Sequence, residues 1–318
     1  MKRDTRRRQQ KERINLFIKI ALMVILICSI KNINTRLDKI QKMLEQMGFT
    51  EAREVSAATN IKEKNDYNEE INYVETIDVI NVEKPMDRTA REVLQKLNEL
   101  GNANPTIMEV YQNHSLYPDD LLAALANNPE MADFVAGYLN RENHGAEGLT
   151  ASEKEQEHPL FLQWDPRWGY KSYGTESNIG LAGCGPTCLS MVLFYLTGDE
   201  TLTPDKIAKY SMDNGYYMQG TGTAWALMED VPKRYNIKVS TLSKSADNMK
   251  AVLDNDSIII CSMGKGDFTA FGHFIVIYGY DENGFFVNDP NCIARSRRNW
   301  TYSEIEKQIK KIWVYTNA

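Results

Sequence analysis

Cysteine and histidine are scarce in this chain of 318 residues, which holds five cysteines and four histidines. Cys184 and Cys188 stand one predicted helical turn apart, but no further ligand follows at a spacing that would complete a metal site. The sequence therefore predicts no metal centre, and no motif calls for an organic cofactor. Whether any two cysteines form a disulfide stays open, because the sequence does not fix the distance between them.

Basic residues are also few, since 37 Lys and Arg stand against 43 Asp and Glu and give a net charge of −6. No basic patch typical of nucleic-acid binding follows the first thirteen residues, so nucleic acid is not an expected partner. Internal repeats are lacking as well, which argues against an array of wall-binding modules.

The apolar segment near the N-terminus lacks a small-residue cleavage site. Residues 1–13 contain seven Lys or Arg against two acids, and residues 14–30 are almost wholly apolar, with Lys19 as their only charge. We predict a cytoplasmic basic tail over 1–13 and a transmembrane signal anchor over 14–30, which places the rest of the chain outside by the positive-inside rule. This is a single-pass, type II arrangement. A cleaved leader peptide is the alternative.

Two further segments are predicted between the anchor and the folded part. Residues 31–48 form a short juxtamembrane helix with apolar residues at spacings of four and three, namely Ile33, Leu37, Ile40, Leu44 and Met47. The stripe covers about two heptads, so either two chains self-associate through residues 33–47 or the helix is solitary. Residues 49–87 are polar, acidic and poor in aromatics, which is typical of a disordered linker.

Residues 88–150 are predicted to form a small helical module. An amphipathic pattern ends at Gly101, and three start signals with proline follow, at Asn104–Pro105, Tyr117–Pro118 and Asn128–Pro129. So small a module makes a thin core and gains from docking on a neighbouring domain. It could brace the enzyme, bind a partner or cover a cleft as a pro-segment.

The motif "GCGPTC" predicts a nucleophile at the start of a helix. Glycines flank Cys184, Pro186 suits a first helical turn, and the apolar run that follows ends at Gly198. At a helix N-terminus the macrodipole favours the thiolate, which is the reactive form of cysteine.

Two downstream motifs predict a base and an orienting acid. His273 opens the strand-like run "GHFIVIYGY", and Asp289 ends the next run, "FFVND", after the turn "DENG". In such a hairpin the start of one strand lies opposite the end of the next, so the carboxylate is expected beside the imidazole. Cys184, His273 and Asp289 thus have the residue types of a thiol-hydrolase triad.

Residues 158–318 resemble the C39-like peptidase family of bacterial, papain-fold cysteine peptidases. The resemblance rests on "QWDPRWGYKSYG", "GCGPTCLSMVLFYLTGD", "GTGTAW", "GHFIVIYGY" and "VNDP". It implies an α+β fold, in which the helix bearing the nucleophile packs on an antiparallel sheet, and a Cys184, His273, Asp289 triad. Together with the anchor it implies an enzyme of the bacterial cell membrane, with its catalytic domain extracytoplasmic and a peptide or protein as substrate.

One departure from the family concerns the oxyanion hole. Papain-type enzymes often have glutamine six residues before the cysteine, and here Asn178 stands at that position. Either Asn178 or Gln163 from the earlier motif is the candidate second donor. Two other functions remain as alternatives, namely a non-catalytic binding module on a papain-like groove and an acyl transferase that shares the acyl-enzyme chemistry.

Overall fold

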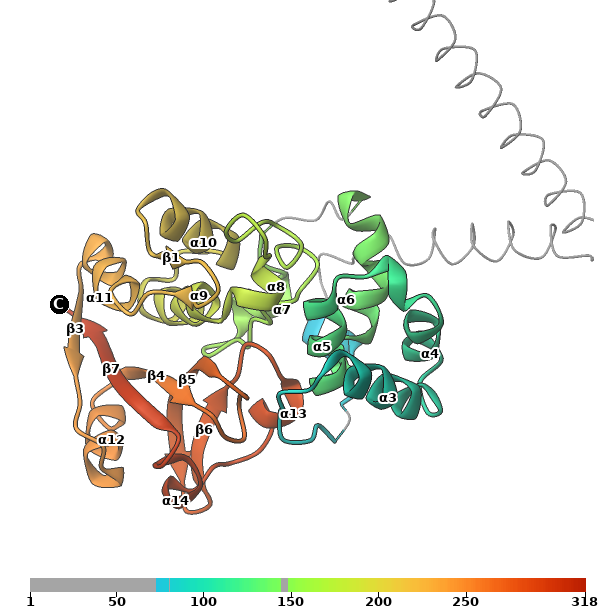
Figure 1. Ribbon diagram of the computed structural model, residues 1–318. Helices are drawn as coiled ribbons and strands as arrows, with labels where there is room; N and C mark the ends of the chain where they lie inside the picture. Colours follow the sequence, from blue (N-terminus) through green and yellow to red (C-terminus); the bar gives the residue numbers. More distant parts are fainter. Residues whose placement is uncertain (1–72, 80, 144–147) are drawn as a thin grey trace, which may run out of the picture. The chain divides into compact units, whose positions relative to one another are not determined.

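The computed structural model describes residues 73–79, 81–143 and 148–318 (Figure 1). All of these residues fall within one compact unit. The predicted basic tail, signal anchor, juxtamembrane helix and residues 49–72 of the linker lie outside the described residues. Among the residues that the structure does describe, no helix has both the length and the hydropathy that crossing a bilayer requires.

Among the described residues before residue 156, the regular elements are all helical. They are η1 (Tyr73–Thr76), α3 (Ala90–Gly101), α4 (Pro105–Gln112), η2 (His114–Leu116), α5 (Asp119–Asn127), η3 (Pro129–Met131), α6 (Ala132–Gly137), η4 (Tyr138–Asn143) and α7 (Ala151–Glu155). Each helix is short, and α3, α4, α5 and α6 contribute apolar side chains to the core. The sequence prediction of several short helices in this region matches these elements.

The three proline-containing helix-start signals lead to different local structures. Asn104 caps α4, because its side chain accepts a hydrogen bond from the Ile107 N–H at 3.2 Å. Pro118 is itself the residue before α5 and provides no side-chain cap. Asn128 bonds the Glu130 N–H at 3.1 Å and begins the short 3₁₀ turn η3, with α6 following it. The second and third signals therefore differ from the first in their local geometry.

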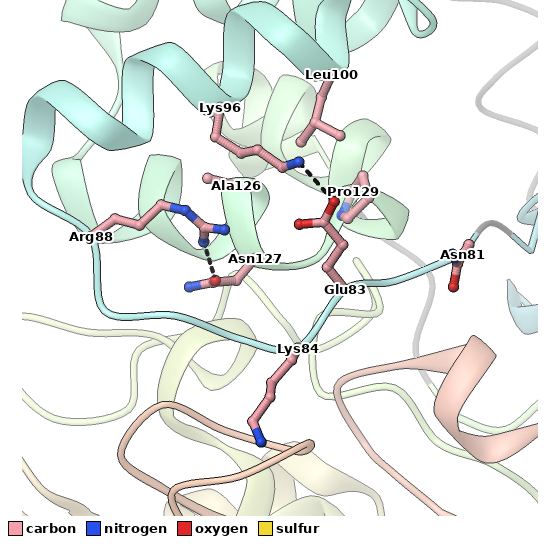
Figure 2. Close-up of a pocket in the computed structure, with 9 residues that line it drawn as sticks. All are labelled: Asn81, Glu83, Lys84, Arg88, Lys96, Leu100, Ala126, Asn127 and Pro129. Atoms are coloured by element: carbon pink, nitrogen blue, oxygen red, sulfur yellow. Dashed lines mark hydrogen bonds and ion pairs between the residues drawn. The ribbon is translucent and has the colours of Figure 1, made fainter.

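The segment before α3 packs against the helical module. Tyr73 and Val74 are buried, and the Asn127 side chain exchanges two hydrogen bonds with the backbone of Met86, at 2.9 and 3.0 Å. Figure 2 shows Glu83 bonded to Lys96 and Arg88 bonded to Asn127 beside a small pocket. Residues 73–79 and 81–87 are thus part of the compact unit, in contrast to the disordered linker expected from their composition.

A five-stranded antiparallel sheet forms the centre of the second region, residues 156–318, with the strand order β3-β7-β4-β5-β6. The strands are β3 (Ile237–Thr241), β4 (Ile258–Gly264), β5 (Gly272–Asp281), β6 (Gly284–Asn288) and β7 (Ile309–Asn317). β4 and β5 are rich in β-branched residues, which suit a buried strand. A separate two-stranded hairpin consists of β1 (Tyr217–Met218) and β2 (Gly222–Thr223).

Helices cover both faces of this sheet (Figure 1). The helices of this region are α8 (Ile179–Ala182), α9 (Cys184–Thr197), α10 (Pro204–Asp213), α11 (Leu227–Asp230), η5 (Pro232–Tyr235), α12 (Ala246–Leu253), α13 (Ile293–Ser296) and α14 (Tyr302–Ile305). One core cluster joins Met249 of α12 and Ile305 of α14 to alternate strand residues such as Cys261 and Ile275. The residues between these point the other way, and α9 packs against β4, β5 and β7. The predicted fold, a helix on an antiparallel sheet, is confirmed.

Candidate active site

Cys184 is the first residue of α9 and lies at the N-terminus of a buried helix. Gly183 precedes the helix, Pro186 occupies its first turn, and Gly198 ends it with a left-handed φ of 67°. These are the start and end signals that the sequence predicted. Cys184 itself is half-buried, whereas the following residues of the helix, Gly185 to Phe194, are buried.

The β1–β2 hairpin packs against the first turn of α9. A Cβ atom added at Gly185 would lie 2.8 Å from the Thr223 side chain, so only glycine fits there without a shift. Thr223 is fixed in turn by the buried Tyr173 hydroxyl, which also bonds Ser211, both at 2.8 Å. The backbone beside the sulfur is therefore held by packing as well as by helix formation.

His273 and Asp289 are in direct contact. The His273 Nε2 atom lies 2.7 Å from the Asp289 Oδ1 atom, and both side chains are buried. In the ladder, β6 ends with Asn288 opposite Val276, so Asp289 continues beyond the paired residues and reaches the ring of His273 near the start of β5. The hairpin thus brings the Asp289 carboxylate beside the His273 ring, which is the arrangement expected from the sequence.

The surroundings of His273 favour its charged form. Burial alone opposes a charge on the ring, but the adjacent Asp289 carboxylate and hydrogen bonds with Asp289 and Cys184 outweigh it and raise the pKa of His273 to about 9. Because Nε2 faces Asp289, Nδ1 is the ring nitrogen left to face the sulfur. The geometry thus places one imidazole between a thiol and a carboxylate.

Asp289 is held in its ionised form by a residue that the sequence analysis missed. Burial opposes ionisation, but the charges of Arg295 and His273 and their hydrogen bonds lower the pKa of Asp289 to about 2. Arg295 Nε donates to Asp289 Oδ2 at 2.6 Å, and the Asn291 N–H donates to Oδ1 at 2.8 Å. Arg295 stands in the basic run "ARSRR", and nothing in that run distinguishes it from its neighbours.

The other described cysteines are distinct from Cys184. Cys188, Cys261 and Cys292 are buried, and all four described cysteines are free. Burial raises the pKa of each of the three buried thiols. Cys188 thus belongs to the core. Among the described residues, no group of histidine, cysteine and carboxylate side chains has the arrangement of a metal site.

The two oxyanion candidates lie close to each other. Asn178 is the N-cap of α8, and its side-chain oxygen accepts the Leu181 N–H at 3.0 Å. Gln163 is buried, its Nε2 donates to the Gly180 carbonyl at 2.8 Å, and its backbone N–H donates to the Pro290 carbonyl at 2.7 Å. Gln163 therefore connects α8, which leads to Cys184, with the segment that follows Asp289.

Three large apolar side chains are exposed in segments that adjoin these residues. Phe271, two residues before His273, is 73% exposed. Met218 belongs to the hairpin that packs on α9, and Trp225 follows that hairpin and makes an edge contact with Trp313. Exposed apolar side chains mark a contact site when they form a contiguous patch, and these three lie on segments next to the candidate site.

Comparisons with known proteins place the second region in a family. The peptidase domain of Streptococcus ComA, a bifunctional ABC transporter of a quorum-sensing pathway, is similar to 43% of this chain over 93% of its own length, with 15% identity and a TM-score of 0.35. A Bacillus anthracis protein described as a C39-like peptidase is similar to 43% of this chain over 90% of its own length, with 16% identity and a TM-score of 0.31. No curated protein matches the chain. The model of the Peptidase_C39 like family matches residues 155–318, and the chain therefore belongs to that family.

Proposed function

We propose that this protein is a cysteine peptidase in which Cys184 is the nucleophile, His273 the base and Asp289 the group that orients the base. The observation that carries the proposal is the position of His273, whose ring is hydrogen-bonded to Asp289 at 2.7 Å and interacts with the Cys184 thiol. A thiol needs a neighbouring base to react as thiolate at neutral pH, and a base needs a fixed orientation to serve it. Membership of the Peptidase_C39 like family supports the same chemistry.

The reaction proceeds in two stages. His273 takes the proton of the Cys184 thiol, and the thiolate attacks the carbonyl carbon of the substrate amide to form a C–S bond and an oxyanion. The imidazolium then gives its proton to the leaving amine, the C–N bond breaks, and a thioester remains on Cys184. A water molecule, deprotonated by His273, attacks the thioester. The C–S bond breaks, the carboxylic acid leaves, and the sulfur regains its proton.

We assign the second oxyanion donor to Gln163 rather than to Asn178. The Asn178 carbonyl oxygen is already used in capping α8, and its side chain is thereby fixed on that helix. The Gln163 Nε2 carries a second hydrogen beyond the one given to Gly180, and its backbone bond to Pro290 holds it beside Asp289. The first donor is the backbone N–H of Cys184, which as the first residue of a helix has no partner within the helix.

The proposed location rests on the sequence alone. The basic residues 1–13 and the apolar residues 14–30 favour a single-pass, type II anchor in a bacterial membrane with the peptidase on the outer side. A peptide or protein outside the membrane is the substrate that such an arrangement can reach. Residues 33–47 add a proposed contact between two anchored chains.

The full-length protein with Cys184→Ala tests the proposed nucleophile, and Cys188→Ala is the matched control. Both variants and the wild type are incubated with a diverse peptide library, and products are read by mass spectrometry. We expect the wild type and Cys188→Ala to cleave peptides, and Cys184→Ala to leave the library intact and to resist a thiol-directed covalent probe. An active Cys184→Ala variant beside an inactive Cys188→Ala variant would refute the assignment.

A wild type that breaks peptide amide bonds and passes the acyl group to an added amine rather than to water would favour the transferase alternative. A wild type that binds peptides without altering them would favour the binding module.

A further inference from the structure

The segment after Asp289 is held by residues from the helical module. The Asn291 carbonyl accepts hydrogen bonds from the Asn128 side chain of the module and from Trp164 Nε1, the latter at 3.0 Å. Asn128 and Asn291 are 163 positions apart in the sequence. The loop that carries the proposed acid is thus fixed from both the family domain and the module before it.

Glu130 makes the strongest of these contacts. Its carboxylate accepts the backbone N–H of Ile293 at 2.8 Å and that of Ala294 at 2.9 Å, which are the first two residues of α13. The side chain is buried, with 5% of its surface exposed. A carboxylate that accepts two N–H groups at the start of a helical turn fixes the position of that turn, because the groups would otherwise be unsatisfied.

Arg295 links the turn held by Glu130 to Asp289. It lies on α13 one residue after Ala294, and its Nε donates to Asp289 Oδ2 at 2.6 Å. Its two terminal nitrogens are buried without a hydrogen-bond partner, and the charge of Glu130 acts on the guanidinium. Arg295 therefore interacts with two carboxylates, one from the module and one from the proposed active site.

The module also packs beside the helix that leads to the nucleophile. Phe134 of α6 is completely buried, and a Cβ atom at Gly180 or Gly169 would lie 2.5 or 2.8 Å from its ring. Tyr170 stacks on Phe134, with the ring centroids 4.4 Å apart, and its hydroxyl donates to the Phe134 carbonyl at 2.6 Å. So close a fit shows a shared core between the module and the family domain.

We infer that Glu130 is a positioning residue for the proposed active site, acting through α13 and Arg295 on Asp289 and thereby on His273. This inference rests on the proposed function. It makes the helical module an integral part of the catalytic unit, which favours the brace among the three roles considered for it and argues against a pro-segment that is removed to open the site.

Loss of the Glu130 carboxylate has a specific expected consequence. The N–H groups of Ile293 and Ala294 lose their acceptor. Of the two carboxylates that act on Arg295, only Asp289 then remains. A small displacement of α13 then moves the Asp289 carboxylate, which orients the His273 ring. Misplacement of a catalytic group by a change far from the chemistry can cost up to about 100-fold in rate.

The test measures alkylation of Cys184 by iodoacetamide in the full-length protein, at pH 7 and at pH 10, with peptide mass spectrometry to identify the modified cysteine. At pH 10 a thiol is ionised with or without an imidazole beside it, so the ratio of the two rates reports the partnership of Cys184 with His273. A free cysteine is only a few per cent thiolate at neutral pH, so complete loss of the partnership lowers the ratio by roughly 30-fold. Thermal unfolding of each variant is recorded in parallel.

We expect Glu130→Ala to lower the pH 7 to pH 10 ratio by about tenfold and Glu130→Gln, which keeps one acceptor oxygen and the volume, to lower it less. The matched control is Glu92→Ala, which removes an exposed carboxylate that bonds the Thr89 N–H at the start of α3 in the same module. We expect that variant to keep the wild-type ratio. Should Glu130→Ala fail to fold, Glu130→Gln decides the question.

A His273→Ala variant distinguishes failure of the positioning role of Glu130 from failure of the proposed function. If it lowers the ratio while both Glu130 variants keep the wild-type value, the positioning role is overturned and the proposed function stands. If His273→Ala itself keeps the wild-type ratio, the Cys184–His273 pair is not functional and the proposed function fails. A merely structural role for Glu130 would lower the unfolding temperature without changing the ratio.

Discussion

The two sides of the candidate site are built in different ways. On the nucleophile side, Cys184 is positioned by residues next to it in the sequence, because Gly183 and Pro186 start the helix that carries it. On the acid side, Asp289 is positioned by Arg295 and, at one remove, by Glu130 from a different part of the chain. The local sequence thus sets the helix start on the first side, which packing against Thr223 then holds, whereas the second side is positioned by tertiary contacts. Four changes test this difference.

Arg295→Met is expected to give the largest loss of stability. It leaves the buried Asp289 carboxylate without its cation, and breaking a buried ion pair from one side costs about 3 to 5 kcal/mol. The pKa of Asp289 is about 2 in the folded protein and lies below its ordinary value of 3.8. Its ionised form therefore stabilises the wild type above pH 3.8, and this stabilisation is lost as the pH falls towards 2.

The destabilisation by Arg295→Met should accordingly be largest at neutral pH and shrink below about pH 4. Urea unfolding at several pH values measures it. Arg298→Met is the control, because it removes a half-exposed guanidinium that pairs with Glu304 on the surface, where the cost is about 1 kcal/mol or less. Equal losses for the two variants would contradict the view that the acid side depends on a buried pair.

Asp289→Asn tests the electrostatic part of the acid side. The amide keeps the size of the side chain but removes the charge that raises the pKa of His273 to about 9. We expect kcat/KM to fall by about 100-fold. We also expect the alkaline limb of the pH–rate profile to move from near pH 9 towards the ordinary pKa of histidine, because the imidazolium then loses its proton at lower pH. A pH–rate profile on a peptide found in the library screen measures both, and an unchanged limb would show that Asp289 does not set the charge of His273.

Gly185→Ala tests the nucleophile side. The added methyl group would lie 2.8 Å from Thr223, and overpacking of this kind costs about 1 to 3 kcal/mol. Because Thr223 is bonded to the buried Tyr173, we expect the strain to shift the hairpin and slow iodoacetamide alkylation of Cys184. Thermal unfolding and the alkylation rate are the measurements. A variant as stable and as reactive as the wild type would show that the first turn of α9 tolerates a looser fit.

Phe271→Ala is expected to have the smallest effect on the folded protein, because its side chain is 73% exposed. Stability should change by less than about 0.5 kcal/mol. If the ring contacts the substrate, its removal raises KM several-fold, since burial of a Phe side chain contributes about 1.5 to 3 kcal/mol at most. Steady-state kinetics on a cleaved peptide measure this, and an unchanged KM would exclude Phe271 from the substrate surface.

Much of the second region could be predicted from its sequence. The helix after "GCGP" begins and ends at the expected residues, because glycine and proline act on the backbone locally. The strand of "GHFIVIYGY" is likewise present as β5. The structure of residues 73–79 and 81–87 could not be predicted in this way, because their acidic composition gives no indication that Tyr73 is buried or that the Met86 backbone bonds to Asn127.

The sequence by itself determined the backbone at Cys184 and the hairpin that brings Asp289 to His273, because both follow from turn and helix signals between close neighbours. Only the tertiary structure decided that Arg295, among several basic residues of one run, pairs with Asp289, and that Glu130 of the helical module fixes the turn between them. The physical reason is burial. A charged side chain is held in a protein interior only by partners that satisfy it, and folding brings those partners together from distant parts of the chain.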